Sequence, residues 1–371
     1  MNSKLSLIKA IIKNNAVTFI AAFCALVTAF FVPPDKEYLS YFDFKTLTCL
    51  FCVLAVVCAL RNVRFFYNLA KSIVKRFKNA KVAVLVLVYV TFIGSMLIAN
   101  DMALLTFLPL GYFVLHTTDK EKYMAFTFIM QNIAANLGGM LTPFGNPQNL
   151  YLYSKFNIPD GEFILIMLPP FLLSVALITV CCLVFVKSEP LEITDDGYNT
   201  PKWRVAVYLV LFALSILIVF RGIPYAIGLI IISLALLILD RRALLNVDYG
   251  LLLTFVFFFI FSGNMGRIDT VRNLFSGLLE KSTLLVSSLC CQFISNVPSA
   301  ILLSQFTDNY KELLYGVNIG GIGTLIASLA SLITFREYTL HKKHSAKEYI
   351  IKFSLFNFSF LAILLVFCSL L

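Results

Sequence analysis

Charged residues are scarce in this 371-residue chain, at 13% of the sequence. Soluble globular domains carry about 25% charged residues, so the chain has roughly half of the charge that such a domain needs. This excludes a soluble enzyme and a nucleic-acid-binding protein. Histidine is also rare, with three residues, and all nine cysteines lie in apolar stretches. Neither a metal cluster nor a disulfide framework is indicated.

Apolar residues make up 60% of the sequence, which includes 36 phenylalanines. Apolar runs near the ~18–20 residues that cross a hydrocarbon core recur from end to end. We therefore predict an all-α polytopic membrane protein with about nine to eleven membrane-embedded elements. The full spans are predicted at residues 15–33, 45–61, 163–186, 204–221, 224–240, 250–266 and 352–371.

The net charge of +10 follows the positive-inside rule rather than indicating an anionic macromolecule. Placing the N-terminus in the cytoplasm gathers Lys4, Lys9, Lys13 and the basic cluster 61–81 on the inner side. The same topology places the C-terminus outside. The expected setting is the cell membrane, with the lipid bilayer as partner and no nucleic acid.

The chain also resembles itself, in two segments at residues 40–157 and 246–337. Four landmarks recur in the same order, of which the last pair is the Asn-x-Gly-Gly of 136–139 and 318–321. The predicted topology starts one segment outside and the other inside, so the repeats are inverted. Inverted repeats are typical of secondary transporters. We read residues 1–371 as one transporter domain, with connecting helices at 158–245.

Each repeat contains an apolar hairpin, at residues 82–118 and 283–307. The arms of the second hairpin are too short to cross the membrane, at about 18–21 Å each. That hairpin should be re-entrant, with Ser295-Asn296 at its tip. Symmetry places Asn100-Asp101 at the equivalent tip, although the first hairpin is long enough to form two ordinary spans.

Each repeat also contains a helix interrupted in its middle, within residues 122–156 and 310–336. Glycine and proline gather at the first interruption, and glycine alone at the second. Unwound backbone at membrane depth is tolerated only where protein or a polar cavity satisfies it. Such a break offers carbonyls to a cation and helix N-termini to an anion. Close helix packing at the glycines is the alternative.

Three aspartates receive different interpretations. Asp101 is the one acidic residue at a predicted hairpin tip, and an intramembrane carboxylate is costly and usually functional. It could bind Na⁺, carry a proton or cap the following helix. Asp43 and Asp248 begin predicted spans, where they should cap helix N-termini.

Four segments, residues 100–109, 132–150, 295–300 and 318–331, resemble the ion transporter superfamily. This group includes citrate, divalent-anion/sodium, arsenite and sodium/proton carriers. The resemblance implies two inverted repeats, each with a re-entrant hairpin and a broken transmembrane helix, and often elevator-type alternating access. The tip Ala99-Asn100-Asp101 looks most like the arsenite and sodium/proton branches.

The resemblance also implies site residues by position. Those expected to line two cation sites are Asn100, Asn136, Gly138 and Thr142 in the first repeat, and Ser295, Asn296, Asn318, Gly320 and Thr324 in the second. Those expected to contact substrate are Asn100, Asp101, Asn146, Asn296 and Ser328.

We expect a secondary active transporter for a small anionic solute, a carboxylate or an inorganic oxyanion, coupled to Na⁺ or H⁺. It would not be an enzyme, would need no cofactor beyond a coupling Na⁺, and could form a homodimer. A sodium/proton antiporter of the same fold and an uncoupled channel are the alternatives.

Overall fold

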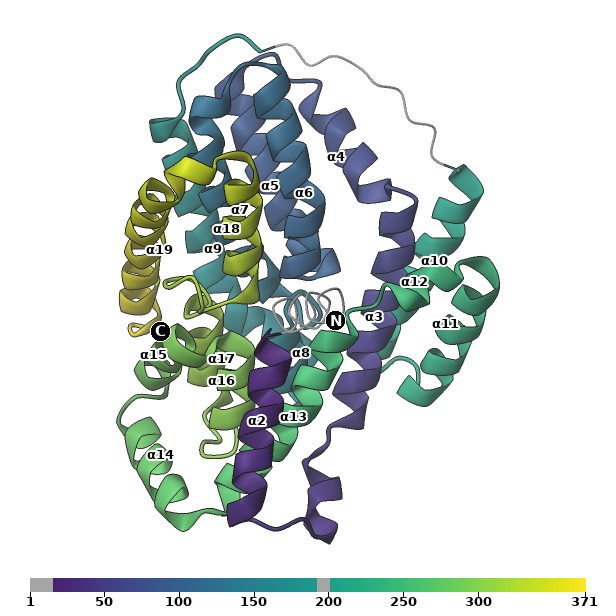
Figure 1. Ribbon diagram of the computed structural model, residues 1–371, viewed down its shortest axis with the longest axis vertical. Helices are drawn as coiled ribbons and strands as arrows, with labels where there is room; N and C mark the ends of the chain where they lie inside the picture. Colours follow the sequence, from purple (N-terminus) through teal and green to yellow (C-terminus); the bar gives the residue numbers. More distant parts are fainter. Residues whose placement is uncertain (1–15, 192–200) are drawn as a thin grey trace, which may run out of the picture.

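The computed structural model describes residues 16–191 and 201–371, and within these ranges the chain is built from helices (Figure 1). One isolated β-bridge, between Asn79 and Pro190, is the sole strand-like pairing in the described part. Among the described residues, six helices are long and apolar enough to cross a membrane. The predicted all-α polytopic membrane protein is confirmed. Lys4, Lys9 and Lys13, on which the predicted orientation partly rests, lie outside the described residues.

The helices follow the predicted order closely. The first part of the chain forms α2 (Ala16–Phe31), η1 (Lys36–Tyr41), α3 (Phe44–Asn62), α4 (Phe65–Val74), α5 (Ala80–Ile98), α6 (Asn100–Thr117), η2 (Glu121–Tyr123), α7 (Met124–Gly138), η3 (Gly139–Leu141) and α8 (Pro147–Lys155). The connecting region forms α9 (Asp160–Phe185), α10 (Lys202–Val219), α11 (Tyr225–Leu239) and α12 (Arg241–Leu245). The last part forms α13 (Tyr249–Arg267), α14 (Asp269–Lys281), α15 (Thr283–Ile294), α16 (Asn296–Leu303), α17 (Tyr310–Ile319), α18 (Leu329–His341), η4 (Lys343–Ser345) and α19 (Ala346–Cys368).

Aspartates start the two helices that open the predicted repeats. Asp43 accepts a hydrogen bond from the backbone N–H of Thr46 at 2.9 Å, and Asp248 accepts one from Leu251 at 2.9 Å. Each carboxylate satisfies an N–H group that has no partner inside the helix. Both predicted caps are confirmed.

The helices pack into two groups. In one, α3 packs against α10, α11 and α12, and α2 packs against α13. In the other, the α5–α6 and α15–α16 hairpins pack against the broken helices α7, α8, α17 and α18, with α9 and α19 alongside. Figure 1 places the two hairpins toward opposite ends of the molecule. The short helices α4 and α14 join the groups, because each contacts one long helix of the first group and one hairpin of the second.

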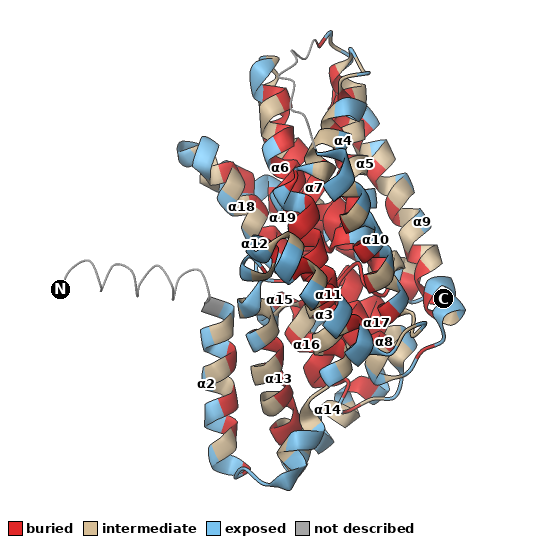
Figure 2. Ribbon diagram, turned by 90° about the vertical axis from the view of Figure 1, so that its right-hand side faces the viewer, coloured by how far each residue is buried: buried red, intermediate tan, exposed pale blue. Residues whose placement is uncertain are grey.

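Burial is concentrated in the interior of the bundle, whereas the outer faces expose apolar side chains (Figure 2). On α2, for example, Ile20, Phe23 and Phe30 are 60%, 64% and 79% exposed. Such an apolar surface suits contact with lipid chains rather than water.

Hydrogen bonds to one carboxylate join several segments at the end of the molecule that the sequence assigns to the cytoplasm. The Glu189 carboxylate accepts hydrogen bonds from Lys120 at 2.8 Å, from Lys122 at 2.5 Å and from the Tyr123 hydroxyl at 3.0 Å. These donors lower the pKa of Glu189 to about 2. The backbone N–H of Ala80 also donates to the Glu189 carbonyl at 2.8 Å. The segment after α9 thereby holds the base of the first hairpin.

Gly138, the last residue of α7, lets this helix cross α5 closely. A Cβ atom at Gly138 would lie 2.2 Å from the carbonyl oxygen of Phe92 and 2.6 Å from the Ser95 hydroxyl. The obstacle is backbone, which cannot rotate away.

We predict that Gly138→Ala destabilises the protein by about 1–3 kcal/mol, because overpacking forces the backbone to shift. Gly161→Ala is the control, since nothing lies within 4 Å of a Cβ at that position in α9. It should leave stability unchanged or raise it by up to ~1 kcal/mol. Thermal unfolding in detergent measures both, and equal melting temperatures for the two variants would contradict the close crossing.

Candidate functional site

The two hairpins turn at a single residue of the same unusual conformation. Ala99 connects α5 to α6 with φ 66° and ψ 151°, and Ser295 connects α15 to α16 with φ 73° and ψ 160°. The next residue, Asn100 or Asn296, then accepts a hydrogen bond through its Oδ1 from the following backbone N–H, at 2.9 Å in both hairpins. Both tips therefore have the same local structure, and both asparagines are 3% exposed.

The two broken helices attach to these hairpins in the same way. The Thr142 hydroxyl donates to the carbonyl oxygen of Met96 at 2.7 Å, and the Thr324 hydroxyl donates to that of Gln292 at 3.0 Å. Both carbonyls belong to the last turn of a hairpin arm, immediately before the tip. Each bond fixes an unwound segment against the C-terminal end of a neighbouring helix.

The two hairpin tips and the two helix breaks together interrupt the helices at four places. Asparagines from three of these four interruptions are joined by hydrogen bonds in the interior. Asn100 donates to the Asn136 Oδ1 at 3.4 Å. Asn146 donates to the Asn136 carbonyl at 3.2 Å and to the Asn318 Oδ1 at 3.3 Å. Asn136 and Asn318 are 2% and 1% exposed.

Asn296, from the fourth interruption, reaches the same place beside Gly321. A Cβ atom built on Gly321 would lie 2.9 Å from the Asn296 Nδ2 and 3.4 Å from the Asn136 Oδ1. The side chains of Asn100, Asn136, Asn146, Asn296 and Asn318 are called the central amide cluster below.

Three further buried amides were not among the predicted site residues, and two of them bond to the cluster. Gln148 donates to the Asn318 Oδ1 at 3.4 Å, and Asn149 accepts from the Asn318 Nδ2 at 2.6 Å. Gln292 bonds to the second break. The polarity of Gln292 within an apolar run is a sequence signal that could have identified it, whereas Gln148 and Asn149 belong to the polar stretch 142–149 of the first break.

The remaining predicted site residues occupy several environments. Gly320, like Gly138, lies against a hairpin arm, since its Cβ would be 2.9 Å from the Ser288 Cα. Ser295 donates to the Ala327 carbonyl at 3.3 Å, and Ser328 caps α18 through the Ser331 N–H at 3.3 Å. Asp101 lies in the first turn of α6, and its Oδ1 is buried without a hydrogen-bond partner.

The cluster lies where eight helix ends meet. Four helices, α6, α8, α16 and α18, begin there, and α5, α7, α15 and α17 end there. α8 and α18 are the half-helices that follow the two breaks. Helix N-termini carry partial positive charge, and C-termini carry partial negative charge. The arrangement can therefore stabilise an anion at the N-termini and a cation at the C-termini.

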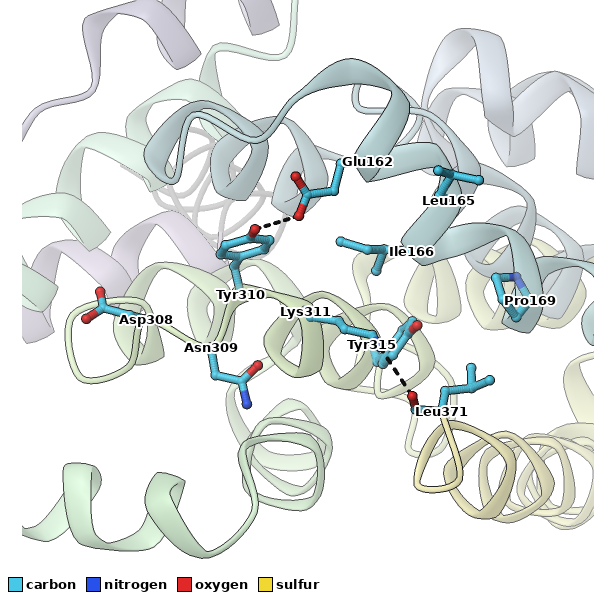
Figure 3. A pocket seen from close by; sticks show the side chains of 10 residues that line it. All are labelled: Glu162, Leu165, Ile166, Pro169, Asp308, Asn309, Tyr310, Lys311, Tyr315 and Leu371. Atoms are coloured by element: carbon cyan, nitrogen blue, oxygen red, sulfur yellow. Dashed lines mark hydrogen bonds between the residues drawn. The ribbon is translucent and has the colours of Figure 1, made fainter.

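Two cavities in the described residues lie outside this cluster. One, of about 440 Å³, is shown in Figure 3, where the Tyr310 hydroxyl donates to Glu162 at 2.6 Å and Lys311 reaches the Leu371 carbonyl. The other, of about 570 Å³, lies between η1, α8 and α13, with Lys155 and Arg272 in its lining. Neither lining includes an asparagine of the cluster.

Comparison with known proteins identifies the family. The sequence profile described as citrate transporter matches residues 5–310. The chain belongs to the citrate transporter family. The predicted likeness to the ion transporter superfamily is thereby confirmed, and the family is one of transporters.

Relatives of this family member bear the names of transporters and membrane proteins. It is 35% identical over 296 residues to an uncharacterized transporter of Methanocaldococcus jannaschii, covering 79% of this chain and 81% of the relative. It is 30% identical to the inner membrane protein YbiR of Escherichia coli, covering 83% and 84%. A silicon efflux transporter of rice, LSI3, is 27% identical over 47% of this chain and 36% of its own length.

We predict that Thr142→Val and Thr324→Val each destabilise this citrate transporter family member by about 0.5–1.5 kcal/mol, because each leaves a hairpin carbonyl without its donor. Thr339→Val is the control, since its hydroxyl bonds to carbonyls of its own helix at 3.0 Å. Thermal unfolding of the three variants tests this. An equal loss in all three would mean that the two matched bonds contribute nothing specific.

Proposed function

We propose that this protein is a secondary active transporter that moves a small anionic solute, a carboxylate or an inorganic oxyanion, driven by a Na⁺ or H⁺ gradient. The observation that carries the proposal is the central amide cluster, in which side chains from two hairpins and two broken helices meet in the interior. Buried polar groups at membrane depth are costly and usually functional.

The charge distribution supports an anion as solute. The N-termini of α6, α8, α16 and α18 supply partial positive charge, and the amides supply N–H donors. Asn100 and Asn296 begin two of these helices, and Asn146 and Ser328 immediately precede the other two. These residues and Asp101 are the proposed substrate contacts. Substrate recognition by oriented dipoles would need no buried lysine or arginine.

Coupling is proposed at the same centre. Asp101 would carry the proton of an H⁺-driven cycle, since its Oδ1 is buried and free of hydrogen bonds. Carbonyls of the unwound segments 138–142 and 320–324 are the oxygen ligands that a Na⁺-driven cycle would use. No resident cofactor is proposed, and Na⁺ would act as cargo.

The matched tips and breaks support inverted repeats, because the same bonds recur in hairpins that point from opposite ends of the molecule (Figure 1). We infer alternating access by movement of the group that holds the cluster against the group built on α3 and α13, with α4 and α14 as connectors. The cell membrane is the proposed location, with the N-terminus inside and the C-terminus outside. A homodimer stays a prediction.

A neutral, hydroxyl-rich oxyacid is the second candidate solute. The Asn146 Oδ1 and the Gln148 Oε1 are buried acceptors without partners, and a solute O–H group would satisfy them. The rice relative is named as a silicon efflux transporter, so the cargo in its name is not a carboxylate. An uncoupled channel and a sodium/proton antiporter are the rival mechanisms.

We predict that Asn100→Ala and Asn296→Ala each lower solute uptake in proteoliposomes at least tenfold, because each removes a proposed solute contact from the cluster. Asn62→Ala is the control, since Asn62 is exposed and bonds to Asp240 at 3.0 Å, away from the cluster. Full uptake by both cluster variants would remove the hairpin tips from the site.

We predict that Asp101→Asn abolishes the response of uptake to an imposed pH gradient if H⁺ drives transport, whereas Asp269→Asn, on the exposed face of α14, keeps it. A response to Na⁺ alone that survives in Asp101→Asn would assign coupling to the backbone carbonyls. Uptake that persists after both gradients are dissipated would contradict active transport and favour the channel.

A further inference from the structure

Gln292 lies in the last turn of α15, and its amide points into the second break. Its Nε2 donates to the carbonyl oxygens of Gly320 at 2.8 Å, Ser288 at 3.1 Å and Ile322 at 3.3 Å. Its Oε1 accepts from the Thr324 N–H at 2.9 Å. The network therefore fixes which end of the amide is the donor, because three acceptors surround the nitrogen and a donor meets the oxygen.

A similar arrangement occurs in the first break, but the amide comes from the opposite side. The Asn149 Nδ2 lies 3.3 Å from the Gly139 carbonyl oxygen, 3.2 Å from that of Met140 and 3.4 Å from that of Thr142. Asn149 belongs to α8, the half-helix that follows the break, whereas Gln292 belongs to a hairpin arm.

The matched bonds of the two halves show which positions are equivalent. At the equivalent positions of the other half, neither Gln292 nor Asn149 is matched by an amide. Thr142 and Thr324 bond to Met96 and Gln292, so these two positions are equivalent. The spacing that relates Asn136 to Asn318 relates Asn149 to Ser331. The hairpin position thus holds methionine in the first half and glutamine in the second, and the half-helix position holds asparagine and then serine. In each break one amide nitrogen lies among several carbonyl oxygens, but it comes from the hairpin arm in the second half and from the following half-helix in the first.

Several carbonyl oxygens that converge on one point form a site for a hard cation. In the second break that point is filled by the Gln292 NH₂ group, whose hydrogens carry partial positive charge. We propose that the Gln292 amide substitutes for a cation in the second break, so that the segment 320–324 is held without Na⁺. Of the two segments proposed above as Na⁺ ligands, 138–142 and 320–324, the second is then excluded. This inference rests on the proposed transport function, and it reduces the number of places where a coupling Na⁺ would bind.

Replacing Gln292 by the residue of the equivalent position tests the substitution. Gln292→Met removes the amide and frees the carbonyls of Gly320 and Ile322. The full-length variant should gain a saturable stabilisation by NaCl over N-methylglucamine chloride that exceeds any in the wild type, by roughly 2–4 °C at a tenfold excess over Kd. Gln131→Met is the matched control, because Gln131 is a buried amide that bonds to Thr91 and Phe107 at a helix crossing. It should respond to Na⁺ as the wild type does.

A second variant covers the case in which Gln292→Met does not fold. Gln292→Glu retains the volume and the acceptor for the Thr324 N–H, but places carboxylate oxygen beside the carbonyls, so its melting temperature should also rise with Na⁺. If both variants fold and each loses as much stability in NaCl as in N-methylglucamine chloride, the Gln292 amide serves only as a structural hydrogen-bond partner. The proposal is then wrong. The unfolding assay contains no solute, so its outcome does not depend on whether the protein takes up a solute. A failure of the proposed transport function would therefore leave the Na⁺ response unaffected.

Discussion

Unwound backbone at membrane depth is the constraint on which the rest of the structure depends. Water cannot satisfy the free N–H and C=O groups there, so protein groups must. Side-chain amides suit this task because each supplies two donors and an acceptor. Asn149 illustrates it, because its Nδ2 donates to the carbonyls of Gly139 at 3.3 Å and Met140 at 3.2 Å while its Oδ1 accepts from Asn318 at 2.6 Å. The breaks persist because the amides tie them to one another.

The same amides join elements that are far apart in the sequence. The bond between Asn146 and Asn318 spans the two halves of the chain, and the threonines hold each break to its own hairpin. A shift of one half-helix therefore changes the bonds of the others. A solute at this centre could compete for those bonds, which connects its binding to the position of the whole helix group. The connectors α4 and α14 are the places where that group could move against α3 and α13.

The sequence predicted the elements well, because membrane thickness restricts helix length and polar residues inside apolar runs are rare. It located the hairpin tips at Asn100 and Asn296 and the helix caps Asp43 and Asp248. Helices lie at the predicted spans, but in the described residues α2 and α11 are shorter than a membrane span, whereas α5, predicted as a hairpin arm, is long enough to cross. It could not show that α9 packs with the broken helices while α10 and α11 pack with α3, since all three are uniformly apolar. It also missed Gln292 and Asn149 as site residues, because a pattern of residue types does not show which backbone carbonyls an amide will bond to.

The most direct test of the central amide cluster as the solute site is a cryo-EM map of the protein saturated with a solute that it transports. The account predicts solute density bounded by Asn100, Asn146, Asn296 and Asn318, at the N-termini of α6, α8, α16 and α18. Density confined to the cavity beside Glu162 and Tyr310, or to the cavity beside Lys155 and Arg272, would contradict it.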